Sequence, residues 1–235
     1  MKHLQTRHYH DFSKQAANLI INQLKAKPNS TLGLATGGTP KGMYEVLRHS
    51  KGDFSQAVTF NLDEYVGLSA NHPQSYRSFM EEQLFEHIDV AFSYIPNGEA
   101  DDLEVECQRY EQLIKQYDGI DLQVLGLGHN GHIGFNEPGT PFSSRTHVVD
   151  LAESTRQANA RFFKHYEEVP SKAVTMGIET IMEAKQIILL VYGEDKQEAL
   201  ERLMNGEVDE NFPASILHQH PNVTLLSGGV KMPHY

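Results

Sequence analysis

The sequence predicts a three-layer αβα sandwich built on a doubly wound, mostly parallel β-sheet. Short runs of β-branched and aliphatic residues alternate with stretches in which apolar residues recur at helical spacing. Several of the strand-like runs (VLGL, IILLVY and VTLL) are almost continuously apolar, which is typical of strands buried on both faces of a parallel sheet. Because strands and helices alternate along the chain, we expect helices to cover both faces of the sheet.

The pattern predicts strands at residues 31–35, 57–62, 121–127, 173–176, 186–192 and 223–227. It predicts helices at residues 13–26, 40–49, 76–87, 101–117, 178–184 and 195–205. The first helix stops before Pro28, and Asp101 and Asp102 suit the positive end of a helix dipole. No linker, repeat or low-complexity segment divides the chain, so we expect a single domain over residues 1–235.

The net charge of −11, from 20 basic and 31 acidic residues, argues against a nucleic-acid or membrane partner. It does not exclude a phosphorylated metabolite, because a few cations in one cleft suffice. Residues 1–12 lack the apolar run of a signal peptide, and the longest apolar stretch, 187–191, is too short to span a bilayer. Cys107, the single cysteine, fits a reducing compartment. We expect a cytoplasmic protein.

The segment TGGTP at residues 36–40 follows the first predicted strand and opens a helix. Gly37 and Gly38 allow a close backbone approach to a ligand, and Thr39 adds a hydroxyl group. Pro40 suits the first helical position, where free N–H groups and the helix dipole favour an anion. A plain strand-to-helix turn explains the same residues equally well. Lys196, directly after the strand at 186–192, is a candidate cationic partner, with Arg161 a weaker one.

Acidic and imidazole groups follow two other predicted strands, where ligands of open parallel sheets bind. Asp63 ends the second strand and could act as a general base, bind a ribose or a metal, or cap a helix. Its neighbour Glu64 is expected to point elsewhere. The loop GHNGHIGFNEPG follows the strand at 121–127 and carries two histidines and a glutamate. His132 can exchange a proton near neutral pH, and Glu137 could orient it.

Two other interpretations of this loop remain open. His129, His132 and Glu137 could bind a metal, but their spacing on a glycine-rich loop is not a standard zinc signature, so acid–base chemistry is favoured. The loop could also be purely structural, which so many titratable groups make the weaker explanation. We therefore predict no metal site.

Taken together, the segments ATGGTPKGMYE, FNLDEYVGL, LGLGHNGHIGFNEPG, SRTHVV, TRQANARFF and GEDK resemble the glucosamine-6-phosphate deaminase (NagB-type isomerase) family. The resemblance covers nearly the whole chain and implies the NagB/RpiA/CoA-transferase-like, Rossmann-like fold. It implies that Asp63 moves a proton between C2 and C1 of the sugar. It implies that His132 opens the sugar ring with Glu137 as its partner. Phosphate ligands would be Gly37, Gly38, Thr39, Arg161 and Lys196.

The implied reaction converts D-glucosamine 6-phosphate and water to D-fructose 6-phosphate and ammonia, in the breakdown of amino sugars such as N-acetylglucosamine. His132 would take the anomeric hydroxyl proton, and Asp63, expected to be ionised at neutral pH, would remove the C2 proton. The resulting imine would then hydrolyse. No step needs a redox or electron-sink cofactor, so we expect none.

The chain departs from the family pattern at two places. Some members have NDGH where this chain has Asn130, which can hydrogen-bond to His132 but cannot share its proton. Longer, hexameric members bind N-acetylglucosamine 6-phosphate at an allosteric site between subunits, partly through basic residues after the SRT motif. His147 and Val149 stand there in this chain. We expect no such site, and a monomer or small homo-oligomer.

Two competing functions remain. A 6-phosphogluconolactonase resembles this fold and also binds a sugar phosphate, but its hydrolysis needs no proton transfer at C2. A non-catalytic sugar-phosphate sensor would usually carry a DNA-binding module, for which the chain has no room before the strand at 31–35 and an unsuitable charge.

Overall fold

The main sheet has seven parallel strands in the order β1-β10-β9-β6-β2-β3-β5. The computed structural model describes residues 1–230, apart from the side chains of Ser154, Ala158 and Phe162. The strands are β1 (Lys2–Thr6), β2 (Thr31–Leu34), β3 (Val58–Asn61), β5 (Phe92–Tyr94), β6 (Leu122–Gly126), β9 (Ile187–Tyr192) and β10 (Val223–Gly228). Since all neighbours are parallel, their carboxyl ends meet at one edge. The predicted doubly wound, mostly parallel fold is confirmed.

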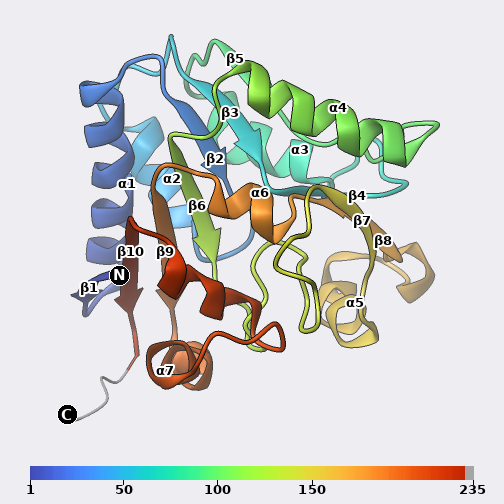
Figure 1. The fold of residues 1–235 in the computed structure, drawn as a ribbon. Helices are drawn as coiled ribbons and strands as arrows, with labels where there is room; N and C mark the ends of the chain where they lie inside the picture. The colour runs from blue at the N-terminus through green and yellow to red at the C-terminus, as the bar shows by residue number, and fades with distance from the viewer. Residues whose placement is uncertain (231–235) are drawn as a thin grey trace.

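Helices cover both faces of this sheet (Figure 1). The helices are α1 (Tyr9–Ala26), α2 (Lys41–Arg48), α3 (Tyr76–Met80), α4 (Leu103–Gln116), α5 (Glu153–Asn159), α6 (Ile178–Met182) and α7 (Gln197–Asn205). A π-helical segment, Glu81–Phe85, continues α3, and short 3-10 turns include Ala160–Phe162, Glu194–Lys196 and Pro213–Gln219. Helix α1 packs on α2, β9 and β10 on one side of the sheet, and α6 lies on the other. Asp102 caps α4 by accepting from two backbone N–H groups.

A second, antiparallel sheet extends the carboxyl edge of the first. It has the order β4-β8-β7, with β4 (Asp63–Tyr65), β7 (His147–Asp150) and β8 (Lys172–Thr175). Residues 173–176, predicted as a strand, therefore contribute to this small sheet and not to the main one. The strands β1, β4, β5 and β7 and the helix α5 were not predicted, because they are short or carry mixed polar residues that show no clear periodicity.

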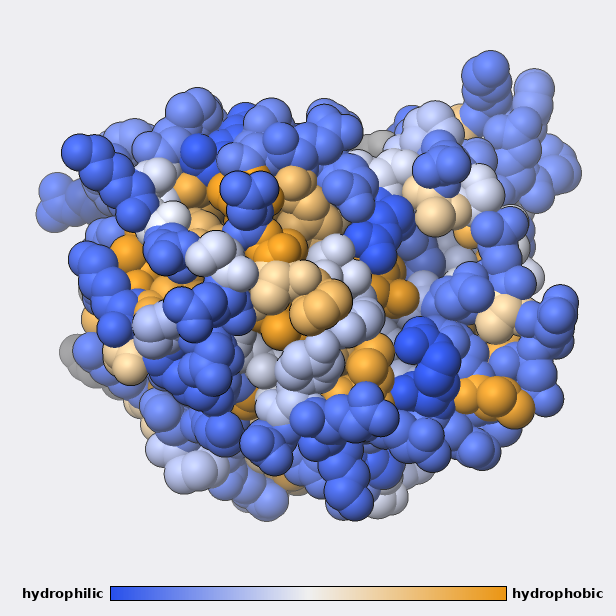
Figure 2. Space-filling view, turned by 90° about the horizontal axis from the view of Figure 1, so that it is seen from above, coloured by the Kyte–Doolittle hydropathy of each residue, from blue (hydrophilic) through white to orange (hydrophobic). Residues whose placement is uncertain are grey.

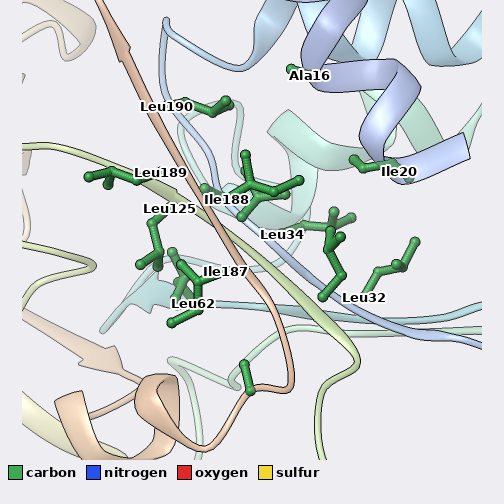
Figure 3. Packing of buried hydrophobic residues seen from close by; sticks show 14 of the residues in the cluster. Ala16, Ile20, Leu32, Leu34, Leu62, Leu125, Ile187, Ile188, Leu189 and Leu190 are labelled. Atoms are coloured by element: carbon green, nitrogen blue, oxygen red, sulfur yellow. The ribbon is translucent and has the colours of Figure 1, made fainter. Parts of the chain in front are cut away.

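The core lies between the main sheet and its helices. Figure 3 shows the side chains of Leu34 and Ile188 from the sheet on the side of Ile20 of α1, with Leu125 on the side away from that helix, and each of these is at most 1% exposed. Burial of a leucine or isoleucine side chain stabilises the fold by roughly 2 kcal/mol. The continuous apolar run of β9, IILLVY, is buried on both faces, as a central parallel strand requires.

The face of the molecule at the amino ends of the strands is mostly polar (Figure 2). Figure 2 looks down on the top of the molecule in Figure 1, at the amino ends of the strands, and shows a largely hydrophilic face with apolar residues between the polar ones. Within residues 1–230, no helix combines the length and the apolar character that crossing a membrane requires.

Candidate active site

A cavity of about 540 Å³ opens at the carboxyl edge of the main sheet. Four connections that follow β2, β3, β6 and β9 contribute to its wall. The lining residues from these connections are Ala35, Thr36, Gly37, Gly38, Thr39, Pro40, Leu62, Asp63, Gly126, Leu127, Gly128, His129, Asn130, His132, Gly134, Phe135 and Lys196. The cavity thus brings together most of the site residues predicted from the sequence.

The turn at residues 36–40 lines the cavity. Gly37 has a φ of 100°, a left-handed conformation that favours glycine, and a Cβ on Gly38 would meet no atom within 4 Å. The hydroxyl of Tyr9 fixes this turn from outside, accepting from the N–H of Gly42 at 2.9 Å and approaching the carbonyl of Thr39 at 3.0 Å. The turn therefore presents backbone to the cavity at the start of α2, as an anion site requires.

Asp63 stands where the chain passes from the main sheet to the small one. The N–H of Leu62 donates to Leu34 of β2, while the carbonyl of Leu62 accepts from Met176, so the neighbouring Asp63 is held at the carboxyl end of β3. Asp63 is 7% exposed and lines the cavity. Within residues 1–230 its carboxyl group receives no hydrogen bond, which leaves both oxygens available to a ligand.

The protonation state of Asp63 differs from the sequence-based expectation. Burial, with a smaller contribution from the nearby charge of Glu64, raises the pKa of Asp63 to about 8. The expectation that Asp63 is ionised at neutral pH is therefore wrong for the free protein. A carboxyl group removed from water without a hydrogen bond or a cation beside it favours its neutral form.

Glu64 points away from the cavity, as expected. Its carboxylate accepts from the backbone N–H groups of Tyr76 and Arg77 at 2.9 and 3.0 Å, at the start of α3. The two adjacent acids therefore differ in environment, because Glu64 is satisfied by backbone donors and Asp63 is not.

Asn130 and His132 form a short hydrogen-bonded chain with Glu137. The Asn130 amide nitrogen donates to Glu137 Oε2 at 2.6 Å, which fixes the amide oxygen on the side of His132. That oxygen lies 2.8 Å from His132 Nδ1. Since an amide oxygen only accepts, His132 carries its proton on Nδ1, and Nε2 keeps a free lone pair in the neutral ring.

Glu137 also contacts His132 directly and is held by Thr155. Its Oε1 lies 3.6 Å from His132 Nδ1 and accepts from the Thr155 hydroxyl at 3.3 Å. Burial lowers the pKa of His132, and the positive charge of Lys196 lowers it further, while the carboxylate of Glu137 raises it. The net result is a lowered pKa, so His132 is neutral near pH 7 and can accept a proton at Nε2.

The two predicted cationic residues differ in position. Lys196 lies in the cavity wall, at the end of the 3-10 turn that follows β9, and burial lowers the pKa of its ammonium group. Arg161 lies in the 3-10 turn Ala160–Phe162, where its side chain is exposed, and it does not line the cavity. His129 also lines the cavity, next to Lys196, with its Nδ1 3.5 Å from the lysine Nζ.

Sequence reasoning missed three further residues of the cavity wall: Tyr76, Thr155 and Asn159. Thr155 and Asn159 belong to α5, and their i, i+4 spacing places both on one helix face, a signal that the segment TRQANARFF does contain. Asn159 also donates to the hydroxyl of Tyr65 at 2.9 Å. Tyr9 was missed as well, because only the fold brings α1 to the turn at 36–40.

Within the described residues, no group of three or more histidine, cysteine and acidic side chains is placed to hold a metal ion. His132 and Glu137 are joined through Asn130 and by a 3.6 Å contact, and His129 faces Asp195 at 2.9 Å instead.

The fold and the cavity together define an α/β protein whose cavity is lined by a glycine turn at the start of a helix, a buried carboxyl group and a histidine. Residues 5–226 match the family described as glucosamine-6-phosphate isomerases/6-phosphogluconolactonase, and the chain belongs to this family. A glucosamine-6-phosphate deaminase of Shouchella clausii is 54% identical over 233 residues, covering 97% of this chain and 94% of the relative. Glucosamine-6-phosphate deaminase 1 of Bacillus subtilis is 52% identical over 232 residues, covering 96% of each chain.

Solved structures agree with this assignment. A monomeric glucosamine-6-phosphate deaminase superposes with a TM-score of 0.95 at 51% identity, covering 97% of both chains. A 6-phosphogluconolactonase from Thermotoga maritima superposes with a TM-score of 0.78 at 21% identity, covering 97% of this chain and 99% of the other. The second likeness shows a common fold.

Proposed function

We propose that this chain is a glucosamine-6-phosphate deaminase, which converts D-glucosamine 6-phosphate and water to D-fructose 6-phosphate and ammonia. The observation that carries the proposal is that Asp63, Asn130 and His132 line one cavity with the turn at 36–40. Glu137, outside the cavity lining, is hydrogen-bonded to Asn130 and lies next to His132. That cavity belongs to a chain 51–54% identical to named deaminases. The reaction needs an anion site, a base for carbon and a base for the ring, and this arrangement can supply all three.

His132 would open the sugar ring. With Nδ1 committed to Asn130, its Nε2 takes the proton of the anomeric hydroxyl group, and the same proton can be returned to the ring oxygen as the C1–O5 bond breaks. Glu137 stabilises the imidazolium ion that forms in between, because its carboxylate lies 3.6 Å from Nδ1. The product of this step is the open-chain aldehyde.

Asp63 would then move a proton between carbons. The substrate carries an amino group on C2, and its positive charge beside a buried carboxyl group favours the carboxylate, so substrate binding supplies the ionisation that the free protein lacks at pH 7. The carboxylate removes the C2 proton and returns it at C1, while the ammonium group of the substrate gives up one proton and the C1 oxygen gains one, which leaves a protonated imine at C2 and a hydroxyl group on C1. Water adds to the imine carbon and ammonia leaves, giving the ketose.

The turn at Gly37, Gly38 and Thr39, together with Lys196, would hold the phosphate group. Backbone N–H groups and one ammonium group suit a dianion, and the turn and Lys196 line the same cavity as Asp63. The assignment of Arg161 to the phosphate stays a prediction.

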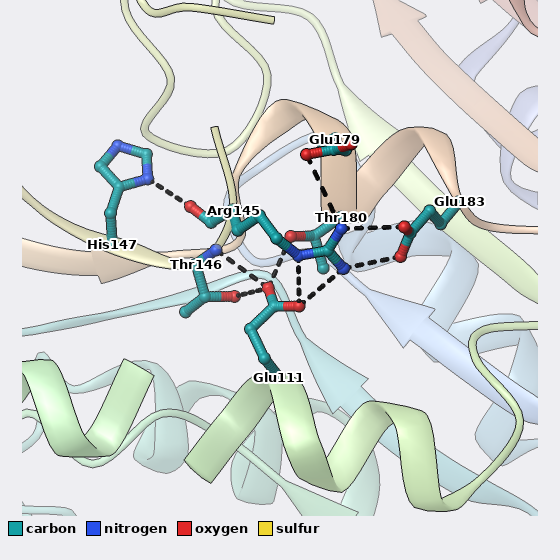
Figure 4. Close-up of polar contacts among 7 residues, drawn as sticks. All are labelled: Glu111, Arg145, Thr146, His147, Glu179, Thr180 and Glu183. Atoms are coloured by element: carbon teal, nitrogen blue, oxygen red, sulfur yellow. Dashed lines mark hydrogen bonds and ion pairs between the residues drawn. The ribbon is translucent and has the colours of Figure 1, made fainter. Parts of the chain in front are cut away.

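We also propose that the protein is a monomer without an N-acetylglucosamine 6-phosphate effector site. The named deaminase with a TM-score of 0.95 is monomeric, which supports the first part. For the second, Arg145 of the SRT motif donates to Glu111 and Glu183 at 2.7–3.0 Å, with Glu179 at 3.7 Å (Figure 4). Three carboxylates around one guanidinium group leave little charge for an anionic effector.

Ammonia release from glucosamine 6-phosphate by the purified chain tests the proposed activity. We expect stoichiometric ammonia and fructose 6-phosphate, with hyperbolic kinetics that added N-acetylglucosamine 6-phosphate leaves unchanged. A sigmoidal rate curve that the effector makes hyperbolic would contradict the proposed absence of an effector site.

The same preparation separates the alternatives. Incubation in deuterated water should exchange the C2 hydrogen of the substrate, which hydrolysis of a lactone does not require. Turnover of 6-phosphogluconolactone without ammonia release would instead make the protein a lactonase. Binding of the sugar phosphate without any turnover would favour a sensor.

A further inference from the structure

We propose that His129 is a positioning residue that holds the Lys196 ammonium group at the cavity, as the middle member of an Asp195–His129–Lys196 chain. This inference rests on the proposed function of Lys196 as a phosphate ligand. Neither the ring-opening step nor the carbon proton transfer uses His129, although it lines the cavity.

The hydrogen bonds of His129 determine which ring nitrogen carries the proton and which one accepts. The Asp195 carboxylate lies 2.9 Å from Nε2, and since a carboxylate only accepts, Nε2 carries the proton. In the neutral ring Nδ1 is then an acceptor. Lys196 Nζ lies 3.5 Å from Nδ1, at the outer limit of a hydrogen bond, and an ammonium group can only donate. The three side chains therefore form one chain of donors and acceptors with consistent polarity.

The imidazole also contacts two opposite charges that form no close ion pair with each other. Asp195 and Lys196 are adjacent in sequence, and a direct ion pair between them would occupy the ammonium protons that a phosphate needs. The structure has no contact of 4.0 Å or less between these two side chains among its described ion pairs, and His129 contacts both. His129 thus passes the orienting effect of the carboxylate to Lys196 without neutralising it.

The local backbone is suited to this arrangement. Gly193, between β9 and the 3-10 turn, has a φ of 108°. A Cβ at this position would come 2.5 Å from Asp195 Oδ1. Glycine here therefore leaves room for the Asp195 carboxylate in the orientation that meets His129.

The side chains of His129 and Asp195 are 66% and 62% exposed, so water screens their interaction and the effect on affinity should be modest. We expect His129→Ala to weaken the binding of inorganic phosphate and to raise KM for glucosamine 6-phosphate, each by about three- to fivefold. The value of kcat should change by less than about twofold, because the phosphate is bound equally in ground and transition states.

His129→Gln should restore the Kd and KM to near the wild-type values, because its amide places a donor and an acceptor about where the ring has them. The matched control is His87→Ala, an exposed histidine outside the cavity lining whose Nε2 contacts the carbonyl of Glu82. It should leave the Kd for inorganic phosphate unchanged.

A double-mutant cycle decides whether His129 acts through Lys196. In the Lys196→Ala background, His129→Ala should have no further effect on the Kd for inorganic phosphate or on KM. Additive effects, a fall in kcat with unchanged KM, or no effect of His129→Ala in the wild-type background would each overturn the inference. If Lys196→Ala itself left KM unchanged, the phosphate role of Lys196 would fail, which is a separate result.

Discussion

The side-chain oxygen of Asn130 lies 2.8 Å from Nδ1 of His132, and this contact fixes the tautomer of the histidine. The orientation of the Asn130 amide is itself determined, because its nitrogen donates to Glu137. An aspartate in this place would share a proton with the ring, whereas asparagine accepts one hydrogen bond and leaves His132 neutral. The chain thus keeps a free base at Nε2, because the hydrogen-bond partner of Nδ1 is an uncharged amide and the Glu137 carboxylate lies farther from Nδ1, at 3.6 Å.

Asn130→Asp should raise the pKa of His132, because a carboxylate beside Nδ1 favours the imidazolium ion. The neutral fraction then falls on the acidic side, so we expect kcat/KM to drop about tenfold at pH 6 and much less at pH 8. Histidine resonances followed by NMR titration, together with the pH profile, check this. Asn130→Ala is the control, since it removes the acceptor without adding charge. An unchanged His132 titration in Asn130→Asp would contradict the assigned contact.

Asp63→Asn should lower kcat by roughly 10²–10⁴-fold, the usual contribution of a general base, because the amide cannot accept the C2 proton. The binding of inorganic phosphate should remain within about twofold of the wild type, since the turn at 36–40 is untouched. Steady-state kinetics and calorimetric titration with phosphate measure the two effects. Weakened phosphate binding with turnover retained would show that Asp63 has a different role.

The rate of the free enzyme should depend on the ionisation of Asp63. Because burial raises the pKa of Asp63 to about 8 and the base must be ionised, kcat/KM should rise with pH and level off above about pH 8. The pKa of His132 is lowered, so its protonation should affect only the more acidic range. The substrate amine titrates as well, and an isotope-edited NMR titration of the Asp63 carboxyl therefore gives the pKa directly. A carboxyl pKa near 4 would refute this explanation of the profile.

The same group makes stability depend on pH. Between about pH 4 and pH 8 the folded state keeps a proton on Asp63 that the unfolded state has lost, so this group lowers the free energy of unfolding as pH rises, with no further loss above about 8. Asp63→Asn removes the dependence. Relative to the wild type, the variant should gain up to about 4 kcal/mol between pH 5 and pH 8. Urea denaturation at several pH values measures the difference, which a pH-independent offset would contradict.

The residues that sequence predicts best are those whose position depends on a strand end alone. Asp63, the turn at 36–40 and the loop after β6 follow strongly apolar strands, and a parallel sheet brings such ends together whatever the helices do. Asp63 shows the limit of this reasoning, because its raised pKa depends on burial and on the absence of a hydrogen bond, which only the packed structure determines.

The spacing of apolar residues in the sequence does not predict which distant segments contact each other. The small sheet forms because β4 pairs with β8, which lies more than a hundred residues later, and β4 is only three residues long. The sequence predicted that Asn130, His132 and Glu137 act together. The direction of each hydrogen bond among them follows only from the structure, in which Glu137 orients the Asn130 amide.

Tyr9→Phe should weaken phosphate binding, because the Tyr9 hydroxyl holds the backbone of the turn that would bind the phosphate. The Tyr9 hydroxyl accepts from the N–H of Gly42 and approaches the carbonyl oxygens of Thr39 and Gly38 at 3.0 and 3.2 Å, so it ties α1 to the turn that presents Gly37 and Gly38. Phenylalanine keeps the ring packing against Tyr192 and removes only these bonds. A part-buried neutral hydrogen bond contributes about 1 kcal/mol, and a looser turn should raise KM for glucosamine 6-phosphate by about fivefold with kcat nearly unchanged. Tyr117→Phe is a matched control, because it also removes a phenol hydrogen bond, to Tyr94, and neither residue lines the cavity. If both variants changed KM equally, the effect would reflect general stability, whereas a change confined to Tyr9→Phe would assign the phenol to the support of the phosphate turn.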